Sequence, residues 1–168
     1  ELEIKLFNDI RNICKDNLKQ LQDVATVISE IDMLHSLALV AIDNNYVRPE
    51  FSLYDEMYIE EGRHPVIETF GTKEFIPNDT SLSNNEKIVL ITGPNMSGKS
   101  TFMRQNALIA IMGQMGSFVP AKYAKIPIFD QIFTRIGSGD DITSGESTFM
   151  SEMLEVNFAL QNATERSM

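Results

Sequence analysis

Residues 90–102 read LITGPNMSGKSTF, and within them Gly93 to Ser100 match the pattern G-x-x-x-x-G-K-[ST] at every fixed position. Glycines let such a loop turn tightly and point its N–H groups at phosphate oxygens, and a following helix adds its positive N-terminal end. Lys99 would place its charge on the β and γ phosphates, and the hydroxyl of Ser100 would bind Mg²⁺. The stretch therefore predicts a nucleotide-binding loop.

The sequence on both sides of this loop has the context that the pattern requires. Residues 87–92, KIVLIT, form a short β-branched run of the kind that is buried on both faces in a parallel sheet. Residues 99–116 show apolar side chains at helical spacing, and Gly116 is a suitable helix end. A buried strand before the loop and a helix after it favour phosphate binding over a chance match.

The remaining C-terminal half alternates in the same way. Residues 78–87 are polar and turn-rich, residues 124–137 have strand character interrupted near Asp130, and residues 147–165 predict a helix with Ser147 or Thr148 as its N-cap. The order strand, helix, strand, helix predicts an α/β fold.

The N-terminal segment has a different character, because residues 1–45 contain neither proline nor glycine. We expect one long helix, or two closely joined helices with Asp16-Asn17 or Ser29 as the joint. One helical face carries an apolar stripe, and a second apolar group farther along is broader and predicts deeper burial. The stripe consists of Phe7, Ile10, Cys14, Leu18, Leu21, Ala25, Ile28 and Ile31, and the second group of Met33, Leu34, Leu37, Ala38, Val40 and Ala41. These patterns predict a helical segment over 1–48 and an α/β domain over 49–168.

Charge and cysteine content limit the possible partners. The 168 residues carry a formal net charge of −10, with 12 acidic and 5 basic side chains in residues 1–60. Such a chain should not bind duplex DNA well by itself, since that affinity depends largely on lysine and arginine. Cys14 is the single cysteine, and the sequence lacks a signal peptide and any run of eighteen uncharged apolar residues. We therefore expect a cytoplasmic chain that does not associate with a membrane.

A second acidic motif, needed for hydrolysis, is not visible. The one downstream apolar run that ends in an acid is IPIFD, but Pro127 interrupts it and Asp130 has no adjoining carboxylate. We interpret Asp130 as a turn residue rather than the acid that holds the metal. Of the two histidines, His64 is interpreted as part of a structural turn, and His35 as a packed or surface residue of the helical segment. The nine methionines are interpreted as core filler.

Longer segments carry a resemblance to a known family. TGPNMSGKSTFMRQNALIAIMGQMGSFVPA (92–121) and IFTRIGSGDDITSGESTFMSEM (132–153) resemble the ATPase domain of the MutS family of DNA mismatch-repair proteins. Residues 30–51 and 59–68 are similar to the segment that leads into that domain. The resemblance implies the sheet and flanking helices of an ABC-type P-loop NTPase, preceded by a long all-α lever. It also implies ATP or ADP and Mg²⁺ as ligands.

The resemblance assigns roles to individual residues. The loop that would bind phosphate comprises Gly93, Pro94, Asn95, Met96, Ser97, Gly98, Lys99, Ser100 and Thr101, with Asn95 as the sensor of the γ-phosphate. Phe75 falls where the family stacks an aromatic ring on adenine, and Ile76 beside it would offer backbone contacts. Composition alone would favour a core position for Phe75. Ser147 and Thr148 lie in the match to the signature loop, and Ser147 would reach the γ-phosphate held by a second subunit.

The resemblance also says what this chain would lack. In the family, an apolar strand ending in Asp-Glu would follow Met168, and mismatched duplex DNA is contacted by other domains. No complete catalytic set is therefore expected here: the chain would bind nucleotide without hydrolysing it, as part of a parent ATPase that dimerises and recruits a MutL-type partner. Alternatives are a non-catalytic module for nucleotide-dependent dimerisation, a relative that handles branched DNA, and a small-molecule phosphotransferase.

Overall fold

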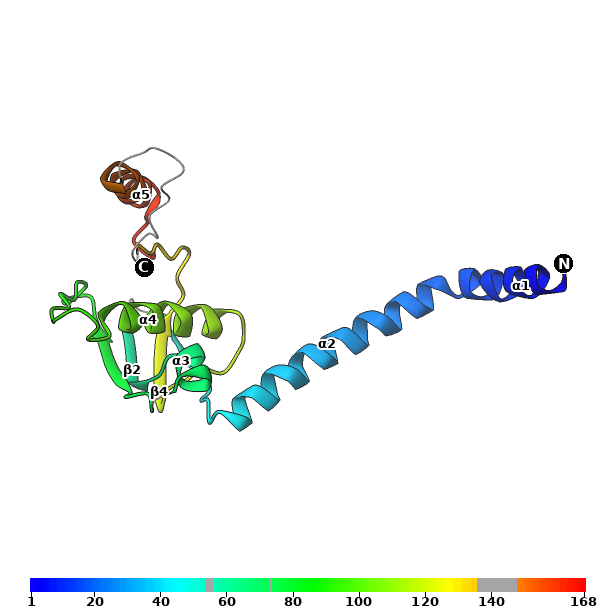
Figure 1. Ribbon diagram of the computed structural model, residues 1–168, viewed down its shortest axis with the longest axis horizontal. Coiled ribbons are helices and arrows are strands. Elements are labelled where there is room, and N and C mark those ends of the chain that lie inside the picture. The colour runs from blue at the N-terminus through cyan, green and yellow to red at the C-terminus, as the bar shows by residue number, and fades with distance from the viewer. Residues whose placement is uncertain (54–55, 73, 136–147) are drawn as a thin grey trace. The chain divides into compact units, whose positions relative to one another are not determined.

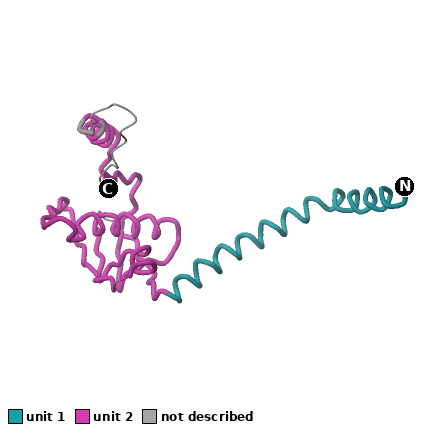
Figure 2. The backbone as a smooth tube through the Cα atoms, viewed as in Figure 1, with its two compact units in different colours: residues 1–43 teal, residues 44–168 magenta. Residues whose placement is uncertain are grey.

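The computed structural model describes residues 1–53, 56–72, 74–135 and 148–168. They divide into two compact units, Glu1–Asp43 and Asn44–Met168 (Figure 2). The domains predicted from the sequence, 1–48 and 49–168, were defined by function as well as by compactness. This division stays a prediction.

The first unit consists of two helices joined at Asn17. Helix α1 spans Leu2–Asp16 and helix α2 spans Leu18–Asp43 (Figure 1). The Asn17 side chain donates a hydrogen bond to the carbonyl oxygen of Ile13 at 2.9 Å, which closes the end of α1. The predicted joint at Asp16-Asn17 is thus confirmed.

The apolar stripe of this unit is exposed. Ile28 is 60% exposed and Leu34 is 60% exposed, whereas Ala41 is buried at 7%. The expectation of deeper burial for the second apolar group was therefore wrong for most of its members, since of the six only Leu37 is half-buried and Ala41 buried. The physical reason is geometric: two helices that follow each other end to end cannot cover each other's apolar faces (Figure 2).

Helix α2 has the length and composition of a membrane-spanning helix, with a mean hydropathy of 1.6 in its most apolar window. Glu30 and Asp32 lie near its middle, where a bilayer would hold each charged group in hydrocarbon at a cost of about 3 kcal/mol. A helix face that packs against protein suits this composition better.

The second unit is built on a small mixed sheet with the strand order β1-β4-β2-β3. Strand β1 pairs in parallel with β4, and the other two pairings are antiparallel. The elements of this unit are β1 (Glu50–Ser52), β2 (Met57–Gly62), α3 (Pro65–Phe70), β3 (Asn78–Leu82), α4 (Lys99–Gln114), β4 (Tyr123–Pro127) and α5 (Thr148–Asn162). The α/β class is confirmed in this coarse form.

The strand predicted directly before the loop is not present as a strand. Residues 87–92 have no regular structure, and Ile88 and Leu90 are 90% and 87% exposed. Residues 78–82, expected to be polar and turn-rich, instead form β3. The reason is pairing: β3 has β2 as a hydrogen-bonded neighbour, whereas no described strand pairs with 87–92.

Helix α4 packs on one face of the sheet and agrees with its prediction. It ends at Gln114, and Gly116 follows with a φ of +90°. Gly113 makes close packing possible, because a Cβ there would lie 2.4 Å from Cδ1 of Ile126 on β4. The core consists of Met57, Ile59, Ile109, Val119, Ala121, Ala124 and Ile126.

The buried face of α4 also carries polar side chains. Thr80 of β3 donates a buried hydrogen bond to Oδ1 of Asn106 at 2.8 Å. Gln105 is fully buried beside Gly62, and neither of its amide atoms has a hydrogen-bond partner among the described residues. This helix is therefore held to the sheet by one specific polar contact as well as by apolar packing.

The methionines do not fill the core in the way expected from composition. Met57 is 1% exposed, but six others are exposed: Met33, Met96, Met103, Met115, Met150 and Met153. The interpretation as core filler was wrong for these six, because they lie on helices and on a loop whose apolar sides no described element covers.

Candidate nucleotide-binding site

The loop before α4 has the backbone of a tight turn. Gly93 and Gly98 have φ values of +151° and +91°, and Met96 between them has a φ of +63°. Nothing lies within 4 Å of the position that a Cβ of Gly98 would take, so the backbone rather than space requires glycine there. The loop leads directly into α4, whose first residue is Lys99.

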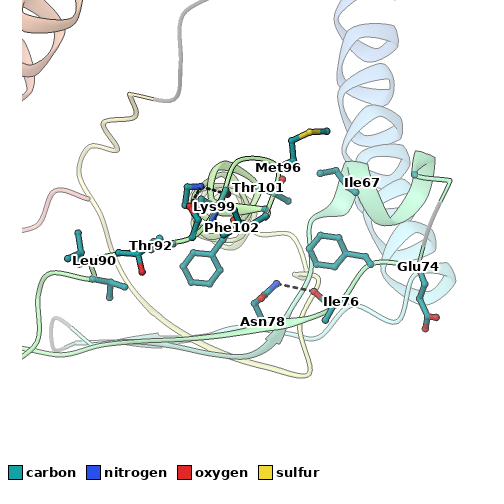
Figure 3. Close-up of a pocket in the computed structure, with 18 of the residues that line it drawn as sticks. Ile67, Glu74, Ile76, Asn78, Leu90, Thr92, Met96, Lys99, Thr101 and Phe102 are labelled. Carbon is teal, nitrogen blue, oxygen red and sulfur yellow. Dashed lines mark hydrogen bonds between the residues drawn. The ribbon is translucent and has the colours of Figure 1, made fainter.

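The Lys99 side chain folds back over the loop. Its Nζ atom donates hydrogen bonds to the carbonyl oxygens of Gly93 at 2.8 Å and Pro94 at 2.6 Å (Figure 3). An ammonium group is thereby held at the mouth of the loop, next to the N-terminal end of a 16-residue helix. The ammonium group and the helix N-terminus both favour the binding of an anion at the loop.

A cavity of about 1070 Å³ joins this loop to a second segment of the chain. Described residues between Ile67 of α3 and Asn78 of β3 line one side, and residues between Val89 and Phe102 line the other. The lining from the first side consists of Ile67, Gly71, Thr72, Glu74, Phe75, Ile76 and Asn78. The volume is sufficient for a nucleotide-sized ligand.

Most of the residues assigned by resemblance lie at this cavity. Phe75 and Ile76 are brought to it, although sixteen residues separate Ile76 from Gly93, the first residue of the loop. From the loop, Gly93, Pro94, Met96, Ser97, Gly98, Lys99 and Thr101 line it. Asn95 and Ser100 do not line the cavity, and both are exposed.

The structure describes only in part the two residues of the predicted signature loop, which would contact a second subunit. Ser147 lies outside the described residues. Thr148 is the first residue of α5, and its side chain is not described. The proposed contact with a second subunit therefore stays a prediction.

Sequence reasoning missed several cavity residues, of which Asn78 and Phe102 are the most prominent. Asn78 donates a hydrogen bond through Nδ2 to the carbonyl oxygen of Ile76 at 2.9 Å. A polar residue directly after the Phe-Ile-Pro run was the available signal, but its role depends on the pairing of β3 with β2. Phe102 is one of the apolar residues at helical spacing in 99–116, and this pattern gave no indication that it would reach the cavity.

His64 is structural, as predicted. It caps α3, and its Nδ1 atom accepts a hydrogen bond from the backbone N–H of Ile67 at 3.4 Å. Burial lowers the pKa of His64, and the nearby charge of Arg104 also acts in this direction. His35 is an exposed residue of α2.

Asp130 serves as an anchor within a turn, in line with its interpretation. Its carboxylate accepts hydrogen bonds from the hydroxyl groups of Thr164 and Ser167, and its backbone N–H donates to the carbonyl oxygen of Arg166. The Thr164 hydroxyl is the main reason why the pKa of Asp130 lies below its usual range. Among the described residues, no group of three or more His, Cys, Asp or Glu side chains could hold a metal ion.

Fold and loop together define a class: a mixed α/β domain with a glycine-rich loop of the phosphate-binding pattern at a helix N-terminus. Comparison with known proteins narrows this class. Residues 89–168 match the family model for MutS domain V. The whole chain is 55% identical over 170 aligned residues to the DNA mismatch repair protein MutS of Clostridium botulinum strain Hall.

A second relative agrees. The DNA mismatch repair protein MutS of Clostridium kluyveri is 54% identical over 169 aligned residues, which cover 99% of this chain. The chain spans 18% and 19% of the lengths of these two relatives. The chain belongs to the MutS family, and the resemblance inferred from sequence is confirmed.

Proposed function

We propose that this chain is the ATP-binding part of a DNA mismatch-repair ATPase. The observation that supports this most directly is the single cavity that brings the glycine-rich loop together with the Phe75-Ile76 segment. One side of the cavity has the N–H groups and the ammonium for a triphosphate, and the other has an aromatic ring for a base. ATP or ADP is the ligand that this combination and the family relationship favour.

The residues at the loop are better suited to binding the phosphate groups of this ligand than to binding Mg²⁺. Gly93, Gly98 and Lys99 have the backbone and charge that phosphate oxygens need. For Mg²⁺ the hydroxyl of Ser100 is the one assigned ligand, and the described residues hold no acidic cluster beside it. We therefore propose that the chain binds nucleotide with negligible turnover.

In the parent protein, nucleotide binding and hydrolysis would be coupled to mismatch recognition and to clamp switching. Two relatives are named as DNA mismatch repair proteins, and this chain is 55% and 54% identical to them. Mismatched duplex DNA would be contacted by other parts of the protein. A second subunit would contact the ATPase domain through Ser147 and Thr148. A MutL-type partner would bind the ATP-bound form of the parent protein, and this would take place in the cytoplasm.

The test is nucleotide binding to the 168-residue chain, measured by calorimetry with ATP and ADP in the presence of Mg²⁺. We expect binding that Lys99→Ala abolishes, because this change removes the charge at the mouth of the loop. Lys19→Ala, on the exposed surface of α2, is the matched control and should bind as the unchanged chain does. Sustained Mg²⁺-dependent release of phosphate by this chain would contradict the proposal of negligible turnover.

A further inference from the structure

Helix α5 carries two charged side chains, Glu152 and Glu155, and both pair with the same arginine. Nη2 of Arg135 donates a hydrogen bond to Oε1 of Glu152 at 2.6 Å. Nε of Arg135 lies 2.9 Å from Oε2 of Glu155, which is the distance of an ion pair but lacks the geometry of a hydrogen bond. One guanidinium group therefore holds both acidic groups of this helix.

These two pairs fix how α5 is turned about its axis. Residues three apart lie on one face of an α-helix, so Glu152 and Glu155 face the same way. Phe158, three residues farther along, extends this face, and its ring meets the ring of Phe133 edge to face with 6.3 Å between the ring centres. A turn of the helix by about 100°, the step between neighbouring helical residues, would separate all three side chains from their partners.

Arg135 belongs to a segment whose backbone is fixed. The N–H of Phe133 donates to the carbonyl oxygen of Met168 at 2.7 Å, and the N–H of Met168 donates to the carbonyl oxygen of Gln131 at 3.0 Å. The hydrogen bonds of Asp130 secure the beginning of the same segment. A side chain that starts from a fixed backbone can orient another group.

The Arg135 side chain is also largely shielded from water. It is 24% exposed, whereas Lys122, which pairs with two acids as well, is 58% exposed. Nε of Arg135 is a buried atom. A shielded ion pair is screened less by salt and water than an exposed one, so Arg135 can restrict its partners more than a surface lysine does.

Arg135 lies beside α4 as well as beside α5. It lines a cavity of about 250 Å³ together with Phe102 of α4, and a cavity of about 540 Å³ together with Leu154 of α5. Helix α4 begins at Lys99 of the glycine-rich loop, and α5 begins at Thr148. The residue that orients α5 is therefore next to the helix that starts at the loop.

We propose that Arg135 is a positioning residue: by bridging Glu152 and Glu155, it fixes the orientation of α5 and thereby the place where Thr148 meets a second subunit. The inference rests on the proposed function, in which Thr148 contacts that subunit. A planar guanidinium has donors on three nitrogens and can bridge two carboxylates, whereas the ammonium group of lysine is a point charge. The orientation of α5 therefore depends on arginine and not merely on a positive charge.

The experiment measures ATP-dependent association of the 168-residue chain by sedimentation velocity, with Mg²⁺ present. We expect the unchanged chain to associate more tightly with ATP than without nucleotide. Arg135→Ala should weaken this association at least about tenfold, and Arg135→Lys should weaken it too, because a point charge leaves the rotation of α5 less restricted. Affinity for inorganic tripolyphosphate, measured by calorimetry, should stay within about twofold in both variants, since the loop at Lys99 is unchanged.

Two further variants separate positioning from a general loss of structure. The double variant Arg135→Glu and Glu152→Arg exchanges the partners of the first ion pair and keeps the net charge, so it should recover most of the association that Arg135→Ala loses. Lys122→Ala is the matched control, because Lys122 also pairs with two acids, Glu60 and Glu61, but these belong to β2. It should associate as the unchanged chain does.

The first two failures concern the proposed function. If tripolyphosphate does not bind, or if Lys99→Ala binds it equally well, the proposed function fails and this inference fails with it. If tripolyphosphate binds in a Lys99-dependent way but ATP does not promote association, nucleotide binding stands, whereas the contact with a second subunit and the role of Arg135 are both overturned.

The other failures concern Arg135 alone. The inference is overturned if Arg135→Ala or Arg135→Lys associates as tightly as the unchanged chain. It is also overturned if Arg135→Ala loses tripolyphosphate affinity by the same factor as association, because Arg135 would then support the fold in general. A double variant that recovers no association would overturn it as well, since the pairing between the segment and α5 would then not be what matters.

Discussion

At the scale of single residues, the loop depends on backbone conformations that few side chains adopt. Gly98 shows this most clearly, because its φ is +91° while the space around it is open. Gly113 is the opposite case: it lies in a regular helix but is pressed against Ile126. Glycine is thus required at position 98 by the backbone conformation, and at position 113 by the lack of room for a side chain.

Replacing Gly98 by alanine should destabilise the chain by about 1 kcal/mol, because a Cβ strains this left-handed conformation. Urea unfolding followed by circular dichroism would measure the change. Ala110→Gly, in the buried part of α4, is a control that loosens the same helix without straining the loop. ATP binding should weaken in Gly98→Ala more than in this control, and equal weakening would contradict a role of the loop conformation.

His64 makes stability depend on pH in a defined direction. Because burial lowers its pKa in the folded chain, the unfolded chain binds the proton more readily. The contribution of neutral His64 is therefore complete above the unfolded pKa of about 6.5 and is lost as the pH falls below it. We expect the free energy of unfolding, measured by urea titration, to decrease from pH 7.5 to pH 5.5.

The variant His64→Asn should remove much of this decrease, since asparagine can still cap α3 by accepting from the N–H of Ile67 but does not titrate. His35→Asn, on the exposed surface of α2, should keep it. The same pH dependence in His64→Asn would show that other groups cause it.

At the scale of elements, local patterns predicted the longer helices and the strand material around β4 (Tyr123–Pro127), but they failed for residues 87–92 and 78–82. The loop, the start of α4 and its end near Gly116 follow from residues that are neighbours in sequence. Residues 87–92 have the composition of a strand, but a strand needs a hydrogen-bonded neighbour, and none of the described strands pairs with them. Residues 78–82 show the converse, because β2 makes a strand out of a polar segment.

The same distinction applies to the site. The glycines and Lys99 could be predicted because the motif is contiguous, and Phe75 could be placed through family resemblance. Asn78 was missed although its hydrogen bond to the carbonyl oxygen of Ile76 spans only two residues, because its place in β3 depends on a pairing with Gly62, sixteen residues earlier in the sequence. Tertiary pairing of this kind leaves no local pattern.

The hydrogen bond between Thr80 and Asn106 joins β3 to the helix that begins at Lys99. Thr80→Val should destabilise the chain by about 1–2 kcal/mol, because it leaves the buried Oδ1 of Asn106 without a donor. Adding Asn106→Leu should recover part of this loss by removing the unpaired group. A double-mutant cycle from urea unfolding would measure the coupling, with the exposed Ser81→Ala as control. Additive effects would show that the contact contributes nothing specific.

At the scale of the whole molecule, charge opposes binding to DNA. The net charge is −10, and several basic side chains are already engaged with acids. Lys122 pairs with Glu60 at 2.6 Å and with Glu61 at 3.1 Å, and Lys125 pairs with Glu56 at 3.1 Å. Phosphate groups would therefore meet few free cations on this part of the surface.

We expect that the 168-residue chain will not bind a 30-base-pair duplex, matched or mismatched, in 150 mM salt, as measured by fluorescence anisotropy. Even non-specific DNA binding, with dissociation constants of about 10⁻⁴ to 10⁻⁶ M, needs unpaired basic groups that release counterions. The double variant Glu56→Lys and Glu60→Lys frees Lys125 and Lys122 from these two acids and adds two further cations. It should bind more tightly than the unchanged chain at low salt, with an affinity that falls as salt rises. Micromolar binding of a mismatched duplex by the unchanged chain would show that recognition lies within these residues, and it would contradict the assignment of DNA contacts to other parts of the protein.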